Sequence, residues 1–199
     1  RSLEADVAST AGATNAASEC LKLLGGNCNV LVNAAGISSA APISKESAAT
    51  FERMHAVNVI APFIFMQAAL VGMKAAKSGR IVNIASVAGL RGYPYIAAYA
   101  ASKHALVGLT RVAAREYAPH GITVNAVCPG YVDTDMTATT IANIAKATGR
   151  THEAARADLE KISPQNRLFT PGEVADAVMS LLSPTASGIN GQCIAIDGG

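Results

Sequence analysis

The sequence predicts an α/β fold, a doubly wound parallel sheet with helices on both faces. Short apolar runs typical of buried strands, such as Val30–Asn33 and Ile122–Val127, alternate along the chain with longer helical segments. This alternation is the pattern that builds parallel sheets. Asn33, Ser86 and Pro129 stand at the ends of three such runs. Because parallel sheets carry their sites at the carboxyl ends of the strands, the pattern also indicates where function lies.

The composition is that of a globular chain rich in buried surface. Its 199 residues are 50% hydrophobic and 15% charged, with a mean hydropathy of +0.28, which suits a single domain over residues 1–199. A net charge of +2 gives no basic footprint for nucleic acid. We expect no membrane span, no signal peptide and a cytoplasmic location. The four scattered cysteines indicate free thiols, and no residue cluster indicates a metal site.

The first part of the chain predicts the end of a strand, then a helix, a strand and a second helix. Leu3–Val7 is the predicted strand end, and Ala13–Leu24 is an amphipathic helix closed by Gly25-Gly26. Val30–Asn33 follows as a short apolar strand. The second helix spans Ser44–His55, with Ser44 as its N-cap.

Two later helices, Val57–Lys77 and Ala97–Ala118, carry apolar residues on more than one face. Such helices are buried on both sides, by the sheet and a neighbour or by a partner subunit. We therefore expect a homodimer or homotetramer formed through residues 57–77 and 97–118. Pro62 has no N–H to donate to the carbonyl of Asn58, which indicates a kink and a carbonyl free to hold a water. Alternatively, Pro62 lies in the first turn of a new helix.

The second half of the chain continues the alternation. Residues 138–161 are helical and polar. Thr170, Pro171 and Glu173 form the pattern of a helix N-terminus, with a capping hydroxyl, a proline in the first turn and an acid at its third position. The remaining expected strands and helix are, in chain order, Ile81–Ala85, Ile122–Val127, Val174–Leu182 and Gln192–Ile196.

Tyr99 and Lys103 are four residues apart in Ala-rich sequence, so on a helix they share one face. An ammonium beside a phenol favours the phenolate and lowers its pKa. This makes Tyr99 a candidate general acid and base, although a core Tyr and a solvated Lys on one helix produce the same spacing. Ser86 follows the strand Ile81–Ala85, which would deliver its hydroxyl to a site at the strand's carboxyl end.

Small residues follow two of the predicted strands, in Asn33-Ala34-Ala35-Gly36 and in Pro129-Gly130. Small side chains after a parallel strand allow another backbone or a flat ligand to approach closely. Ordinary tight packing between strand and loop explains the first pattern equally well.

Together with Asn58, these residues resemble the short-chain dehydrogenase/reductase family, whose domain is Rossmann-like. The resemblance implies an NAD(P)-dependent enzyme that interconverts a secondary alcohol and a ketone. It implies that Tyr99 protonates the nascent alkoxide and that Ser86 hydrogen-bonds the carbonyl oxygen. It also implies that Lys103 lowers the pKa of Tyr99 and grips the nicotinamide ribose, while Asn58 completes a proton relay through water.

The family's glycine-rich turn, which holds the cofactor pyrophosphate, does not occur in this sequence. By the family's usual spacing, we expect roughly 50 to 60 further residues before Arg1 in a whole domain, among them the residue that separates NAD from NADP. The cofactor is therefore NAD or NADP, with the choice open. The resemblance assigns to it Asp6, Val7, Asn33, Ala34, Ala35, Gly36, Tyr99, Lys103, Pro129, Gly130, Val132 and Thr134.

The sequence from Gly121 to Gly130 looks like that of 3-oxoacyl-carrier-protein reductases and polyketide ketoreductases, and residues 138–161 resemble the family's substrate lid. The lid around Ile141–Ala155 is also similar to that of 3-hydroxybutyrate dehydrogenases. Those enzymes, however, bind a carboxylate with a His and a Lys where this chain has Ala88 and Ile96. We therefore expect a neutral, larger or carrier-linked ketone. The expected substrate residues are Ala88, Arg91, Ile96 and Tyr131.

Arg91 either meets a phosphopantetheine or CoA tether or is a solvated surface residue. A 3-hydroxybutyrate-like or hydroxysteroid-like dehydrogenase is the alternative enzyme. A cofactor-binding or regulatory protein without turnover is the alternative outside catalysis.

Overall fold

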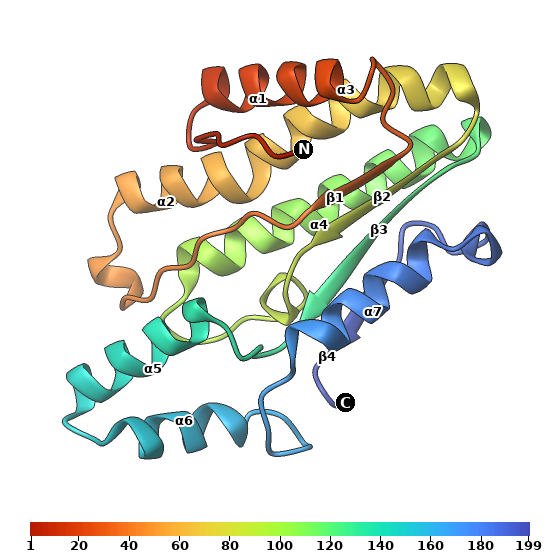
Figure 1. Cartoon of the computed structure of the whole chain (residues 1–199). Helices are drawn as coiled ribbons and strands as arrows, with labels where there is room; N and C mark the ends of the chain where they lie inside the picture. The colour runs from red at the N-terminus through yellow and green to blue at the C-terminus, as the bar shows by residue number, and fades with distance from the viewer.

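A computed structural model describes residues 1–199 and contains one sheet of four parallel strands in the order β1-β2-β3-β4. The strands are β1 (Val30–Asn33), β2 (Gly79–Ile84), β3 (Ile122–Pro129) and β4 (Cys193–Ile196). Figure 1 shows β2 and β3 as the long central strands. They pair over six residues, from Gly79 opposite Ile122 to Ile84 opposite Val127. The predicted parallel α/β fold is confirmed.

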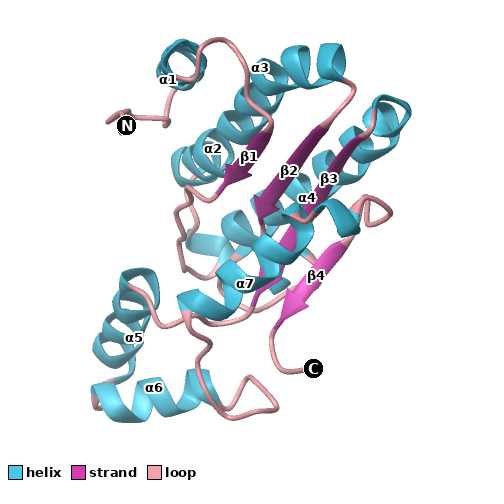
Figure 2. Ribbon diagram, turned by 45° about the vertical axis from the view of Figure 1, so that its right-hand side comes forward, coloured by secondary structure: helices cyan, strands magenta, loops and turns pink.

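Helices cover both faces of this sheet, as Figure 2 shows. Alternate residues of a strand face opposite sides, and the packing follows that rule. Ile81 and Val124 face helices α3 and α4, whereas Val82 and Val127 pack against α7. The helices are α1 (Thr10–Leu23), α2 (Ala48–His55), α3 (Ala61–Ala76), α4 (Ala97–Tyr117), α5 (Asp135–Thr148), α6 (His152–Glu160) and α7 (Pro171–Leu182).

Helices α2 and α3 run into one another through a π-helical turn over Ala56–Ile60. A π turn inserts an extra residue into a helix and frequently marks a functional site. Asn58 lies within this turn, and Pro62 occupies the first turn of α3 immediately after it. The irregularity expected at Pro62 therefore takes the form of a π turn upstream of it.

The helical segment Ala48–Ala76 is long and apolar enough to cross a membrane by length and composition, with a hydropathy of 1.8. The expectation that no segment approaches a membrane span was therefore wrong. Core helices meet the same criterion when they are packed on several sides. Here 44% of the most apolar window is buried inside the protein, where α3 packs against α1 and the sheet, so this helix is compatible with a soluble protein.

Two other local expectations were wrong. Leu3–Val7 forms no strand, because these residues are largely exposed and pair with none of the four strands. Ser47, not Ser44, caps α2, because its hydroxyl accepts from Thr50 N, while Ser44 lies in a separate 3-10 turn. Residues 138–161 are helical as expected, and they form two helices because Gly149 ends α5 with a φ of 70°.

The capping box at α7 is confirmed. The Thr170 hydroxyl accepts from Glu173 N, and the Glu173 carboxylate accepts from Thr170 N. The Arg167 guanidinium and these hydrogen bonds lower the pKa of Glu173 to about 2.

Candidate active site

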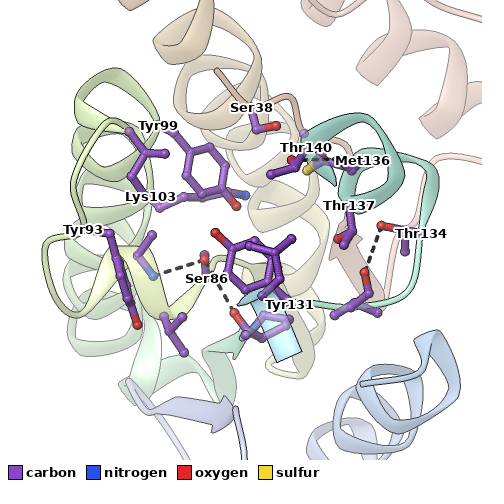
Figure 3. Close-up of a pocket in the computed structure, with 18 of the residues that line it drawn as sticks. Ser38, Ser86, Tyr93, Tyr99, Lys103, Tyr131, Thr134, Met136, Thr137 and Thr140 are labelled. Atoms are coloured by element: carbon purple, nitrogen blue, oxygen red, sulfur yellow. Dashed lines mark hydrogen bonds between the residues drawn. The ribbon is translucent and has the colours of Figure 1, made fainter. Parts of the chain in front are cut away.

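A cavity of about 1230 Å³ opens at the carboxyl ends of β2 and β3. Its walls are the residues that follow β2, the start of α4, the segment after β3, helix α5 and one side of α7. Figure 3 shows Ser86, Tyr99 and Lys103 on one side and Thr134, Met136, Thr137 and Thr140 on the other. The cavity lies where parallel sheets carry their sites.

Ser86 reaches this cavity because β2 ends two residues earlier and the chain stays extended, with a φ of −175° at Ser86. Its Oγ accepts from Ala88 N at 3.1 Å and donates to the Pro129 carbonyl at 3.5 Å. The 3-10 turn that follows packs directly on α4. A Cβ on Gly89 would lie 2.7 Å from the Lys103 carbonyl, so this approach requires glycine.

Tyr99 and Lys103 lie on the first two turns of α4, as their spacing predicts. Lys103 is buried, with 4% of its surface exposed. Its Nζ donates to the Ile84 carbonyl at 2.8 Å and lies 5.7 Å from the centre of the Tyr99 ring. The side chain therefore connects α4 to the end of β2 and places the ammonium over the Tyr99 ring.

The expected lowering of the Tyr99 pKa by Lys103 is not found. Burial raises the pKa of Tyr99, and hydrogen bonding with Ser86 is the main opposing influence. Burial also lowers the pKa of Lys103 to about 8. The reason is geometric, because the ammonium lies over the ring and donates to a backbone carbonyl. Burial, opposed by hydrogen bonding with Ser86, therefore sets the direction of the shift in the Tyr99 pKa.

Asn58 lies behind the cavity wall and is fully buried. Its side chain accepts from Ile37 N at 3.0 Å and donates to the Ile37 carbonyl at 2.9 Å and to Ser102 Oγ at 3.0 Å. Asn58 therefore connects the loop after β1 to α4. A Cβ on Gly36 would lie 3.4 Å from Asn58 Oδ1 and 3.5 Å from Lys103 Nζ, so both polar groups lie close to Gly36.

Most residues expected to bind a cofactor line the cavity. These are Ala34, Gly36, Tyr99, Lys103, Pro129, Gly130, Val132 and Thr134. The remaining four lie elsewhere. Val7, Asn33 and Ala35 line a smaller apolar pocket beside β1, while the Asp6 carboxylate accepts from Ala8 N.

The cavity wall fits the nicotinamide half of a dinucleotide. Ala34 and Gly36 after β1 and Gly130 after β3 contribute small or no side chains to the wall. A Cβ on Gly130 would meet the Asp197 Cβ at 3.3 Å. Backbone this bare accepts a flat ring at close range. Lys103 and Thr134 also line the cavity and would be available to hold the polar groups of a nicotinamide.

All four residues expected to face the substrate, Ala88, Arg91, Ile96 and Tyr131, line the cavity. Burial raises the pKa of Tyr131. The sequence allows Arg91 to be either a tether contact or a solvated side chain. In the structure Arg91 forms an ion pair instead. Its guanidinium donates to the Tyr93 hydroxyl at 2.6 Å and to Asp197 at 3.0 Å.

Sequence reasoning missed Tyr93, Met136, Thr140 and Asp197, which also line the cavity. Tyr93 carried a signal, since it lies in the loop between Ser86 and Tyr99. Met136 and Thr140 are one turn apart on α5 and face the cavity together. Asp197 stands next to Gly130 only because β4 pairs with β3, a contact between residues 67 positions apart that no local pattern reveals.

The family model described as enoyl-(acyl carrier protein) reductase matches residues 1–199. An uncharacterized oxidoreductase of Bacillus subtilis, YxjF, is 43% identical over 178 residues, covering 87% of this chain and 68% of the relative. 2-(S)-hydroxypropyl-CoM dehydrogenase 3 of Xanthobacter autotrophicus is 40% identical over 195 residues, covering 98% and 74%. A structure of actinorhodin polyketide ketoreductase with NADPH is similar with a TM-score of 0.91 and 33% identity, covering 98% and 75%. The chain belongs to the short-chain dehydrogenase/reductase family.

Proposed function

We propose that the protein uses NAD or NADP to interconvert a secondary alcohol and an uncharged ketone. One observation carries the proposal. Ser86, Tyr99 and Lys103 meet on one side of a large cavity at the carboxyl edge of the sheet, beside a wall bare enough for a nicotinamide. The relatives are dehydrogenases and ketoreductases, and the similar actinorhodin structure contains NADPH.

The roles of the side chains follow from their chemistry. The bound nicotinamide supplies the hydride, and this chain positions the carbonyl and delivers a proton. Ser86 Oγ hydrogen-bonds the carbonyl oxygen, where negative charge develops. The raised pKa of Tyr99 keeps its phenol protonated, so it donates its proton to that oxygen during reduction. Lys103, with a pKa of about 8, titrates near neutrality and holds the nicotinamide ribose.

Asn58 does not line the cavity and acts by positioning other residues. Its amide fixes the loop after β1 against α4, which sets the distance between the nicotinamide wall and the catalytic helix. Its proposed place in a water relay to Lys103 is supported by the close approach of both Asn58 Oδ1 and Lys103 Nζ to Gly36.

The substrate is proposed to be a 3-oxoacyl compound or another neutral or carrier-linked ketone. The apolar side chains of Ala88 and Ile96 at the cavity support this choice over a small hydroxy acid. A hydroxysteroid-like substrate is the alternative that the large cavity volume favours. A 3-hydroxybutyrate-like substrate draws support from a D-beta-hydroxybutyrate dehydrogenase of Rhizobium meliloti, which is 36% identical.

Residues 138–161 are proposed to act as the substrate lid. Helices α5 and α6 enclose a small apolar cluster of their own, apart from the clusters at the sheet. A dimer or tetramer through residues 57–77 and 97–118 is supported by exposed apolar side chains there, among them Phe63, Val71 and Val112. A cytoplasmic location remains part of the proposal.

A panel of uncharged ketones with NADH and with NADPH tests the function. We expect oxidation of at least one reduced cofactor that depends on the ketone. A fluorescence titration measures cofactor binding separately. If the protein binds the cofactor but oxidises it with none of the ketones, the result supports the non-catalytic alternative.

A further inference from the structure

Three cationic side chains line the cavity, Lys103, Arg91 and Arg167. Lys103 belongs to the catalytic group and donates to the Ile84 carbonyl. The other two decide whether the cavity offers a binding site to an anionic substrate, because an arginine without a carboxylate partner is the natural ligand of a carboxylate or phosphate.

Arg167 is fully engaged. Its two terminal nitrogens donate to the two oxygens of Glu173 at 2.9 and 2.6 Å, and its Nε donates to Gln165 at 3.1 Å. The guanidinium also lies 4.5 Å from the centre of the Phe169 ring. Because both of its terminal nitrogens pair with Glu173, Arg167 lines the cavity without offering a binding site to an anionic substrate.

Arg91 is engaged by Asp197 and Tyr93. Its terminal nitrogen donates to Asp197 Oδ2 at 3.0 Å, and its Nε donates to the Tyr93 hydroxyl at 2.6 Å. The side chain of Arg91 is 56% exposed, whereas that of Asp197 is only 16% exposed. The exposed arginine therefore pairs with a carboxylate that is mostly shielded from solvent.

Asp197 is fixed by its own surroundings. Its backbone carbonyl accepts from Ser163 Oγ at 3.0 Å, and its second carboxylate oxygen accepts from Gly199 N at 3.2 Å. Gly130, at the start of the turn after β3, packs against it. These contacts do not involve Arg91, and they hold Asp197 beside the turn after β3.

We propose that Asp197 is the residue that selects substrate charge, by pairing Arg91 so that the cavity accepts uncharged ketones and rejects anionic ones. The inference rests on the proposed function and names the residue behind its substrate class. An incoming carboxylate would have to displace Asp197 from Arg91 while facing the repulsion of the displaced charge, and such like-charge contacts oppose binding strongly.

The pair ethyl 3-oxobutanoate and 3-oxobutanoate tests this, since the two ketones differ in charge around the same reacting carbonyl. We expect the wild-type protein to prefer the ester in kcat/KM. Asp197→Asn keeps the shape and one oxygen acceptor but removes the negative charge that pairs with Arg91. It is expected to shift the preference toward the acid by about tenfold or more, the equivalent of one modest ionic contact.

Two further variants isolate the cause. Arg91→Leu added to Asp197→Asn is expected to abolish the gain for the acid. Asp176→Asn removes the same charge from an exposed position on α7 outside the cavity. It is expected to leave the preference unchanged, which separates the local pair from the net charge of the protein.

Calorimetric binding of 3-hydroxybutanoate and of its ethyl ester gives a readout without turnover. If neither ketone is reduced by the wild-type protein, the proposed function fails for these ketones, while binding still tests Asp197. An Asp197→Asn protein that neither binds nor reduces the acid better than wild type would overturn the inference. A gain that survives Arg91→Leu would overturn it as well.

Discussion

The two sides of the cavity are built differently. On one side, Ser86, Tyr99 and Lys103 come from β2 and α4, which pack into the main core and are connected by buried hydrogen bonds. On the other side, α5 and α6 pack mostly on each other around Ile141, Leu159 and their neighbours. Their polar contacts are exposed ion pairs such as those made by Arg156 with Asp133 and Glu160.

This difference separates the residues that carry out the reaction from the helices that admit the substrate. Groups that transfer a proton must hold their geometry closely, and a dense core with satisfied buried polar groups provides that rigidity. A wall that admits and releases substrate gains from weaker attachment. The first side is therefore expected to be intolerant of substitution and the second to be tolerant, and the following predictions test that contrast.

Tyr99→Phe is expected to have the largest effect. Loss of the proton donor should lower ketone reduction by about 10²–10⁴-fold, the usual contribution of a general acid, with cofactor binding largely intact. Steady-state rates and a cofactor titration measure the two properties. Tyr117→Phe, at the far end of α4 and outside the cavity, is the matched control. Substantial residual activity in Tyr99→Phe would remove Tyr99 from the mechanism.

Asn83→Ala tests the rigid side through stability. Asn83 is fully buried on β2, accepts from Asn33 Nδ2 at 2.8 Å and donates to Thr110 on α4 at 2.9 Å. Its removal leaves two buried partners unsatisfied, so we expect a loss of about 2 kcal/mol in the free energy of unfolding. Urea denaturation measures this, with the exposed Asn15→Ala on α1 as control. Equal stability of the two variants would show that the network is dispensable.

The lowered pKa of Lys103 predicts that the free energy of unfolding depends on pH. Its pKa is lowered from 10.5 to about 8 in the folded protein, so between these pH values the unfolded chain holds a proton that the folded protein has released. Stability should therefore rise with pH in this window, by at most about 1.4 kcal/mol per pH unit from this group. Lys103→Met should flatten the rise. Identical pH profiles of urea unfolding for both proteins would contradict the lowered pKa.

Arg150→Ala should have the smallest effect. The side chain pairs with Asp158 on the α5–α6 side, and both partners are substantially exposed. Exposed pairs of this kind contribute about 0–1 kcal/mol, so unfolding and kcat should change little. A loss as large as that of Asn83→Ala would show that the two sides are equally rigid.

The sequence predicted the rigid side well because its signals are local. The apolar runs at β2 and β3, the four-residue spacing of Tyr99 and Lys103, and the glycine and proline turns each report on neighbouring residues. The capping box at Thr170 was predictable for the same reason, since all its members lie within one turn.

What the sequence left open depends on contacts between distant residues. Local pattern at Leu3–Val7 indicated a strand, but a strand exists only where another strand pairs with it. The pKa of Tyr99 depends on burial and on where the Lys103 ammonium points, which spacing on a helix does not determine. The pairing of Arg91 with Asp197 joins residues 106 positions apart.

The most direct test of the account compares Ser86→Ala, Tyr99→Phe and the double variant in the reduction of one uncharged ketone. If both hydroxyls act on the same carbonyl oxygen, they function as a unit and their losses are not additive. We predict that the double variant reduces the ketone about as slowly as Tyr99→Phe alone. A double loss equal to the product of the two single losses would show that Ser86 and Tyr99 act independently, and would contradict the shared site proposed for them.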